Sequence, residues 1–393
     1  MPQHAINIPV KPDVLKWARQ SAGKSVQDVA GRLSLALSTV EAWEQGEQTP
    51  TLAHVRQLAT FLKRPLAAFF LPTPPAEPPV PGDFRRLPED KAEPFSIKTI
   101  LAIRRARAIQ NAAREFIGES GHRPVQRVGS ATTDDDPAAL ARAARAFLGF
   151  SEQTLSRCSS NASAFEARKG ALESHGFFVA ELPFPLAEAR AFSIADTYTP
   201  LIVLNHKDSY AGKSFSLFHE YAHLLLGKSG VLDNTRESRL TSEGRRAEQF
   251  CNAFAAEFLV QVDTLIHMNV VTQHRAGQAW KDSEIDQVAD RFRVSAHVIA
   301  TRLLTSGRLS DAAYSTLCDH YEKLYEELSK EKHFGKPVPA KTCVRENGRP
   351  FVSLVYEAFG NQRISYKEIA DCLGIKPKYV DAVSRLLKEH QAA

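Results

Sequence analysis

A proline-rich stretch divides this chain and limits its fold more than any other feature. Residues 72–82 read PTPPAEPPVPG. Proline fixes its own φ and has no N–H to donate, so neither a helix nor a sheet runs easily through such a stretch. We therefore predict an extended, proline-rich linker over 72–94, which separates a domain at 1–71 from a second domain that begins at residue 95.

The composition is that of a globular protein with more than one domain. The chain has 393 residues, of which 43% are hydrophobic and 24% are charged, so there is enough apolar material for a sizeable core. Five cysteines are scattered without a CxxC pair, which indicates free thiols and neither a disulfide framework nor a cysteine zinc site. The net charge of +5 suits nucleic-acid binding and an ordinary basic enzyme equally well.

The start of the chain shows no pattern of export. Its first residues, MPQHAINIPVKPD, lack the apolar centre of a signal peptide, and no apolar run is long enough to span a bilayer. Free thiols are typical of a reducing compartment. We expect a cytoplasmic protein with no membrane partner.

The segment before the linker has the rhythm of a helix-turn-helix. Apolar side chains at helical spacing mark three successive helices: Val26, Val29, Ala30 and Leu33, then Val40 and Trp43, then Val55, Leu58, Ala59 and Leu62. The segment WEQGEQTPT resembles the Xre/Cro/CI-type domain. That resemblance implies a five-helix domain at 1–71, in which the helix Leu37–Gln45 would enter the major groove of DNA.

The outward positions of this second helix decide what the domain could bind. They are Ser38, Thr39, Glu41 and Gln45. Only Gln45 is a good reader of a base edge, and the helix contains no lysine or arginine. We keep two kinds of partner for this domain: double-stranded DNA, or a docked protein, which includes a second copy of the chain in a homodimer.

A central segment, KSFSLFHEYAHLLLG (213–227), carries the pattern HExxH on an apolar helix that ends at Gly227. His219 and His223 are four residues apart, so they lie one turn above each other, where both imidazoles can bind one zinc ion. Glu220 would lie beside such a metal rather than on it, and could act as a general base. The alternative is a pair of partly buried histidines on an ordinary helix.

A catalytic zinc ion needs a third protein ligand. Glu248, in the segment SEGRRAEQFCNAFAAEFLVQ, is our candidate, because a loop after Gly227 allows this helix to return antiparallel to the first. Asn252 is four residues further on the same face and would orient one imidazole. The alternative for Glu248 is a solvated charge at a helix start. The rival ligands are Glu237, Glu243 and Glu257.

Short runs with β character precede the HExxH helix. We predict strands at Phe177–Leu182, Ala191–Asp196 and Leu201–Leu204. The segment 199–209 would lie beside the metal and could bind an extended peptide by strand addition.

The motifs HEYAH and AEQFCNAFAAEFL together resemble the ImmA/IrrE metallopeptidases, whose pattern is HExxH followed by ExxANxFAAxLL. Cys251 stands where that family usually has alanine, and Val260 with Gln261 stands where a proline often closes the pattern. The resemblance implies Zn²⁺ held by His219, His223 and Glu248, with Glu220 as general base. It also implies a protein substrate, such as a repressor or another regulator.

The fold that we expect is mostly α-helical with a small β-sheet. A zincin-like α+β peptidase domain is predicted at 95–282, a helix-turn-helix-like segment at 283–326 and a C-terminal helical domain at 327–393. We interpret both C-terminal segments as helical packing that closes the core, with a flexible connection at 327–350. The arginine cluster Arg104, Arg105 and Arg107 is expected on a solvated helix face.

Three functional hypotheses follow. The first is a zinc metallo-endopeptidase that cleaves a regulatory protein partner and is coupled to the helix-turn-helix domain. The second is a transcription regulator in which the zinc site is structural or sensory, and the third is a toxin–antitoxin or phage-defence component in which docking matters more than cutting. Glu220 favours the enzyme, because a structural zinc site needs no carboxylate at that position.

Overall fold

The computed structural model of the protein describes residues 7–75, 95–118, 124–125, 127–227, 242–274, 279–330 and 338–391. Most of these residues are helical and three strands form one small sheet, which confirms the predicted fold class. The chain forms two compact units, one of Met1–Pro79 with Lys91–Leu101 and one of Val80–Asp90 with Ala102–Ala393. Most of the predicted linker lies outside the described residues.

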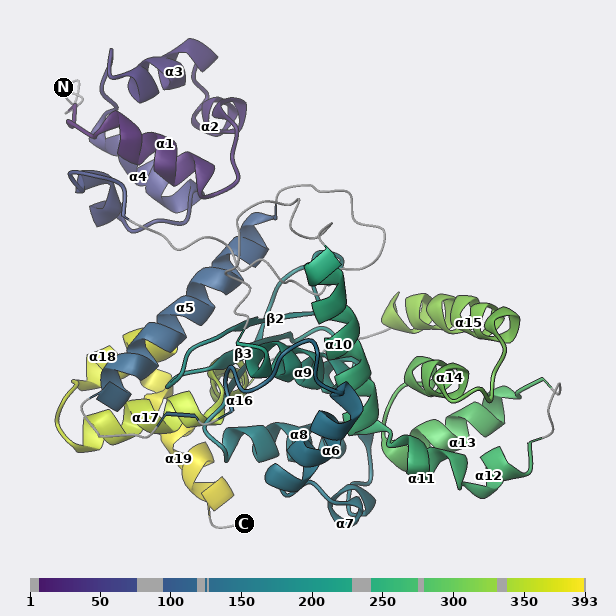
Figure 1. Ribbon diagram of the computed structural model, residues 1–393. Helices are drawn as coiled ribbons and strands as arrows, with labels where there is room; N and C mark the ends of the chain where they lie inside the picture. The colour runs from purple at the N-terminus through teal and green to yellow at the C-terminus, as the bar shows by residue number, and fades with distance from the viewer. Residues whose placement is uncertain are drawn as a thin grey trace. The chain divides into compact units, whose positions relative to one another are not determined.

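The N-terminal unit is a bundle of short helices (Figure 1). Its elements are α1 (Pro12–Gln20), α2 (Val26–Leu33), α3 (Leu37–Gln45), α4 (Leu52–Phe61) and the 3₁₀ helix η1 (Leu66–Phe70). Helix α2 begins at a capping box, in which the side chains of Ser25 and Asp28 each accept the backbone N–H of the other. Gly46 ends α3 with a φ of +83°, a left-handed conformation that glycine adopts without strain.

The second unit is built around a small mixed sheet. Its strands are β1 (Phe178–Leu182), β2 (Ala191–Ile194) and β3 (Leu201–Asn205), in the order β1-β3-β2. Strand β3 pairs parallel with β1 and antiparallel with β2. Because β3 has a partner on each side, it cannot accept an added strand, and our prediction that 199–209 binds a peptide in this way is wrong.

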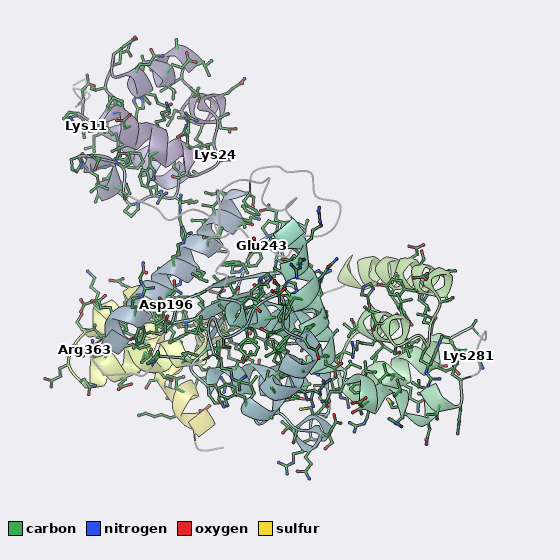
Figure 2. The ribbon with its side chains drawn as sticks, in the orientation of Figure 1. Lys11, Lys24, Asp196, Glu243, Lys281 and Arg363 are labelled. Atoms are coloured by element: carbon green, nitrogen blue, oxygen red, sulfur yellow. The ribbon has the colours of Figure 1, made fainter. Side chains whose placement is uncertain are left out.

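Helices pack around the sheet, and those from α6 to α10 contribute to the main core. They are α5 (Ile97–Gly118), α6 (Pro137–Phe147), α7 (Glu152–Ser156), α8 (Asn161–Glu173), α9 (Tyr210–Leu225) and α10 (Ser242–Leu259). Helix α9 contacts β2, β3, α8 and α10, and side chains fill the space around it (Figure 2). The rings of Phe218 and Phe258 stack with centroids 3.6 Å apart, and losing one such ring costs about 3–5 kcal/mol.

Helix α5 is tied to the end of the sheet and to the C-terminal helices. Arg114 pairs with Asp196, which lies just after β2 and is labelled in Figure 2. Arg105 donates hydrogen bonds to the side chain of Asn347 and, at 2.7 Å, to the carbonyl oxygen of Cys372. Our prediction of a solvated arginine face is therefore wrong at Arg105, because helices that follow much later in the chain cover it.

Two further groups of helices complete the unit. The first contains α11 (Val262–Ile266), α12 (Asn269–Thr272), α13 (Asp282–Phe292), α14 (Ala296–Thr305) and α15 (Asp311–Lys330). The second contains α16 (Pro339–Asn347), α17 (Arg349–Gly360), α18 (Tyr366–Leu373), the 3₁₀ helix η3 (Pro377–Tyr379) and α19 (Val380–Gln391). Among the described residues, no helix is both long and apolar enough to cross a membrane.

The predicted flexible connection at 327–350 is wrong over most of its length. Helix α15 continues to Lys330, and α16 begins at Pro339, while 331–337 lie outside the described residues. A proline in the first helical turn breaks no hydrogen bond, because the N–H groups of that turn have no partner within the helix.

Candidate metal centre and helix-turn-helix surface

Helix α9 carries the HEYAH motif inside the protein. Ser209 caps it by accepting the backbone N–H of Gly212 at 3.0 Å. Every side chain from Leu217 to Leu225 is buried. Its polar groups must therefore find their partners within the protein, since unpaired buried polar groups are costly.

The three side chains that were predicted as metal ligands meet at one place. Oε2 of Glu248, on α10, lies 3.3 Å from Nε2 of His219, and its Oε1 lies 3.3 Å from Nε2 of His223. The two Nε2 atoms are 3.2 Å apart. One ligand atom from each side chain lies within 4.8 Å of the others. Two imidazole nitrogens and one carboxylate form a donor set that zinc prefers, and a zinc ion held by them would have its fourth position free for a water molecule.

The electrostatics of this cluster favour a bound positive charge. Burial raises the pKa of Glu248, but hydrogen bonds with His219 and His223 outweigh it and hold that pKa well below its usual value. Burial lowers the pKa of His223, but Cys251 and the carboxylates of Glu248 and Glu220 raise it well above its usual value. Carboxylates around two imidazoles stabilise either a proton or a metal ion between them.

Asn252 lies within hydrogen-bonding distance of one of the two histidines. Its Oδ1 lies 3.1 Å from Nδ1 of His219. With Nδ1 as the donor, Nε2 of His219 keeps its lone pair and directs it toward Glu248 and His223. Helix α10 thus presents Glu248 and Asn252 from one face, as their spacing of four residues predicts.

Ser193, which was not predicted as a site residue, contacts Glu220. The Ser193 hydroxyl donates a hydrogen bond of 2.8 Å to Oε2 of Glu220, and both side chains are buried. The signal in the sequence is weak: Ser193 is one polar residue within the apolar strand AFSI. Only the packing of β2 against α9 brings the two residues together.

The rival ligands are elsewhere or outside the described residues. Glu257 is buried and paired with Arg302, with Arg142 at 3.4 Å, so its carboxylate is already neutralised. Glu243 is exposed in the first turn of α10 and is not part of the cluster. Glu237 lies outside the described residues.

The predicted DNA-facing positions of α3 are at the surface. Ser38, Glu41 and Gln45 are exposed and Thr39 is half-buried. Arg19 of α1 holds Glu44 with two hydrogen bonds of 2.6 and 2.7 Å, which fixes α3 against α1. The outer face of α3 therefore carries one carboxylate and no cation.

Fold and site together define a two-part protein: a helix-turn-helix unit and an α+β domain whose buried HExxH helix faces a glutamate. Residues 172–304 match the family model of the IrrE N-terminal-like domain (Peptidase_M78), and residues 13–68 match that of a helix-turn-helix domain (HTH_31). The chain thus contains an M78-type domain and an N-terminal helix-turn-helix domain. The comparisons with curated proteins and with solved structures gave no match.

Proposed function

We propose that this protein is a zinc metallo-endopeptidase that cleaves a regulatory protein partner. The observation that carries the proposal is the meeting of His219, His223 and Glu248 at one point. The M78 match supports the peptidase class, because it spans both the HEYAH helix and the helix of Glu248. We further propose that the protein acts in the cytoplasm, which its free cysteines support.

In this proposal the chain supplies the binding site and the proton transfer. When bound, zinc would act as a Lewis acid that polarises the scissile carbonyl and lowers the pKa of the attacking water. Glu220 accepts a proton from that water as its oxygen joins the carbonyl carbon. The C–N bond then breaks, and Glu220 returns the proton to the leaving nitrogen. Ser193 holds the Glu220 carboxylate through its Oε2.

A second candidate function is a transcription regulator in which the metal site is structural or sensory. The match of residues 13–68 to a helix-turn-helix domain supports it, as does the exposure of Ser38, Glu41 and Gln45 on α3. In this case double-stranded DNA would be the partner. The neutral to acidic face of α3 also suits a docked protein, including a second copy of the chain.

Metal analysis of the purified protein tests the site. We expect about one zinc ion per chain in the wild type and less than about a tenth of that in His223→Ala, because a catalytic zinc site needs three protein ligands. His267→Ala, an exposed histidine on another element, is the matched control and should retain zinc. Equal zinc in His223→Ala and the wild type would remove the proposed site.

Cleavage of an unbiased peptide mixture, read by mass spectrometry, separates the two functions. We expect Glu220→Gln to keep its zinc and to cut at least about a hundredfold more slowly, because it cannot carry the proton. Wild-type rates in that variant would contradict the role of Glu220. A wild-type protein that holds zinc and cuts nothing, including candidate regulators, would favour the regulator.

A further inference from the structure

Helices α18 and α19, joined by the 3₁₀ helix η3, follow one another in the order of a helix-turn-helix. Helix α17 contacts α18 and α19, and α16 covers another side of α19. Each helix of this group buries apolar side chains: Phe351, Val352 and Val355 from α17, Ile369, Ala370 and Leu373 from α18, and Val380 and Val383 from α19. The helices therefore share a core, as a folded helix-turn-helix domain does.

Side-chain bonds fix the start of α19. Gly374 ends α18 with a φ of +66°, and Pro377 opens η3 directly before α19. The hydroxyl of Tyr366, on α18, lies 3.2 Å from the carbonyl oxygen of Pro377 and 3.3 Å from Oδ1 of Asp381. Tyr356 of α17 donates to the carbonyl oxygen of Val380 at 2.6 Å. The second helix of the motif is thus held in a defined orientation, which groove binding requires.

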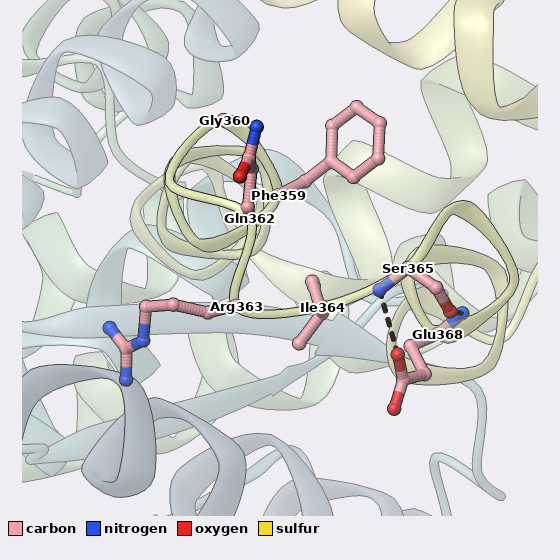
Figure 3. Close-up of a pocket in the computed structure, with 7 residues that line it drawn as sticks. All are labelled: Phe359, Gly360, Gln362, Arg363, Ile364, Ser365 and Glu368. Carbon is pink, nitrogen blue, oxygen red and sulfur yellow. Dashed lines mark hydrogen bonds between the residues drawn. The ribbon is translucent and has the colours of Figure 1, made fainter.

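The turn between α17 and α18 is also anchored (Figure 3). The backbone N–H of Ser365 donates to Glu368 at 2.7 Å, which caps α18, and Arg363 donates to the carbonyl oxygen of Phe116 on α5 at 3.1 Å. A surface hollow of about 600 Å³ lies over this turn. Its charged side chains, Arg363 and Glu368, are both already bonded, so we assign no ligand to it.

Exposed cations gather on α19 and on the turn before it. Residues 338–391 contain nine Lys and Arg and six Asp and Glu, a formal net charge of +3. Residues 1–71 contain eight Lys and Arg and five Asp and Glu, so their net charge is also +3. Lys376 and Lys378 are exposed before α19, and Arg385 and Lys388 are exposed along it. Among the described residues, none of these four cations forms an ion pair.

The arrangement of the four cations suits contact with DNA phosphates better than contact with an acidic protein surface. Asp381, Arg385 and Lys388 recur at spacings of four and three residues and share one helix face. Asp381 on that face is engaged by Tyr366, and exposed Glu389 is the other carboxylate of the helix. Helix α3, by comparison, contains no lysine or arginine that could contact DNA phosphates.

We propose that α18, η3 and α19 bind double-stranded DNA independently of its sequence, with Lys376, Lys378, Arg385 and Lys388 on backbone phosphates. Phosphate contacts of this kind release counterions and provide most of sequence-independent DNA affinity. The surface is separate from the metal centre, so it adds a nucleic-acid function to the proposed peptidase. It does not depend on that activity.

Binding of the full-length protein to a labelled 24-base-pair duplex of arbitrary sequence tests this surface. Fluorescence anisotropy over a series of NaCl concentrations gives the affinity and its salt dependence. We expect Lys378→Ala with Arg385→Ala and Lys388→Ala to weaken binding about tenfold or more. The slope of log K against log salt should fall by about 3, since each lost phosphate contact removes about 1.

Two matched variants distinguish this surface from general charge and from α3. Arg157→Ala with Lys281→Ala and Arg308→Ala removes the same charge from exposed sites elsewhere in the unit, and should leave both affinity and slope within about twofold of the wild type. Ser38→Ala with Gln45→Ala on α3 should do the same for this duplex. If either control weakens binding as much as the α19 variant, the proposal is overturned.

A variant that gains affinity for DNA provides a further test, because misfolding would not tighten DNA binding. Asp381→Asn removes a negative charge from the face and keeps an acceptor for Tyr366, so DNA binding should tighten about two- to fivefold. An unchanged or weaker affinity would overturn the proposal. So would an acidic polyglutamate peptide that competes as well as DNA at equal charge, because the partner would then be an acidic protein surface.

Discussion

The hydroxyl of Ser193 donates a hydrogen bond of 2.8 Å to Oε2 of Glu220. This hydrogen bond connects the sheet to the proposed general base. The two residues are 27 positions apart and belong to β2 and α9. A carboxylate that is held by a donor on a strand loses rotational freedom, and a positioned base transfers protons more effectively.

Ser193→Ala should lower kcat about tenfold with little change in KM or in zinc content. The substitution leaves the Glu220 carboxylate in place and removes only the donor that positions it. Steady-state kinetics on a cleaved peptide, together with metal analysis, measure this. Ser174→Ala, whose hydroxyl bonds only within α8 and its neighbours, is the control and should be neutral. Normal kcat in Ser193→Ala would argue against a positioning role.

Asn252→Ala should weaken zinc binding about 10- to 100-fold, which is the usual effect of losing the partner of a ligating histidine. The reason is that Nδ1 of His219 loses its acceptor at 3.1 Å. Competition with a chelator of known affinity measures the change. Gln249→Ala, an exposed neighbour on the same helix, should bind zinc as the wild type does. Equal affinities in the two variants would contradict the assignment.

Glu248 and Glu257 should respond differently to the same substitution. Glu248→Gln should lose zinc and stay folded, because the side chain is only half-buried. Glu257→Gln should keep zinc and lose about 3–5 kcal/mol of stability, because it leaves Arg302 buried without its charge partner. Metal analysis and urea unfolding of both variants provide the comparison. If only Glu257→Gln lost zinc, the third ligand would be Glu257 and not Glu248.

The stability of the protein should fall as the pH rises from about 4.5 to 7 because of Glu173. Burial raises the pKa of this carboxyl to about 7, although Lys169 and Arg349 oppose the rise. The folded state therefore binds a proton that the unfolded state has already released, and stability is lost as the pH increases through this window.

Glu173→Gln removes this dependence. It should stabilise the protein at pH 8 by roughly 1–3 kcal/mol and have little effect at pH 4. Urea unfolding at the two pH values measures the difference. Glu357→Gln, on the exposed side of α17, should show no comparable gain. A Glu173→Gln protein that is less stable at pH 8 would show that the carboxyl is ionised and paired.

Gly348 should tolerate no side chain. Its φ is +77°, and a Cβ at this position would lie 2.5 Å from the carbonyl oxygen of Val179 on β1. Gly348→Ala should cost about 2–4 kcal/mol, because both the backbone and the contact between α17 and the sheet would have to shift. Gly360→Ala, at the end of the same helix with no atom within 4 Å, should be neutral or slightly stabilising. Thermal unfolding of both variants tests the contrast.

Several features of the fold were predictable because they depend on local spacing. The helices α2, α3 and α4 follow from apolar residues at helical intervals, and the β runs from short apolar segments between turn residues. His219 and His223 lie on one side of α9 because they are four residues apart. The match of residues 172–304 agrees with the family that the motifs indicated.

Other features depend on strand order, which the sequence of this chain does not reveal. The central place of β3 rules out strand addition at 199–209, although its apolar run alone does not distinguish a central strand from an edge strand. The same pairing places β2 against α9 and so brings Ser193 to Glu220. The expected flexible connection at 327–350 contains α16 instead, because Pro339 stands at the helix start, where a proline breaks no hydrogen bond.

The amino-acid sequence by itself determined the secondary structure around the motif, the paired histidines and the small set of acids from which a third ligand could come. Only the tertiary structure places these acids: Glu248 faces the imidazoles, which supports it as the proposed third ligand, while Glu257 pairs with Arg302. The physical reason is that helical and strand periodicities act over a few residues, whereas contacts between distant segments depend on how helices and strands pack.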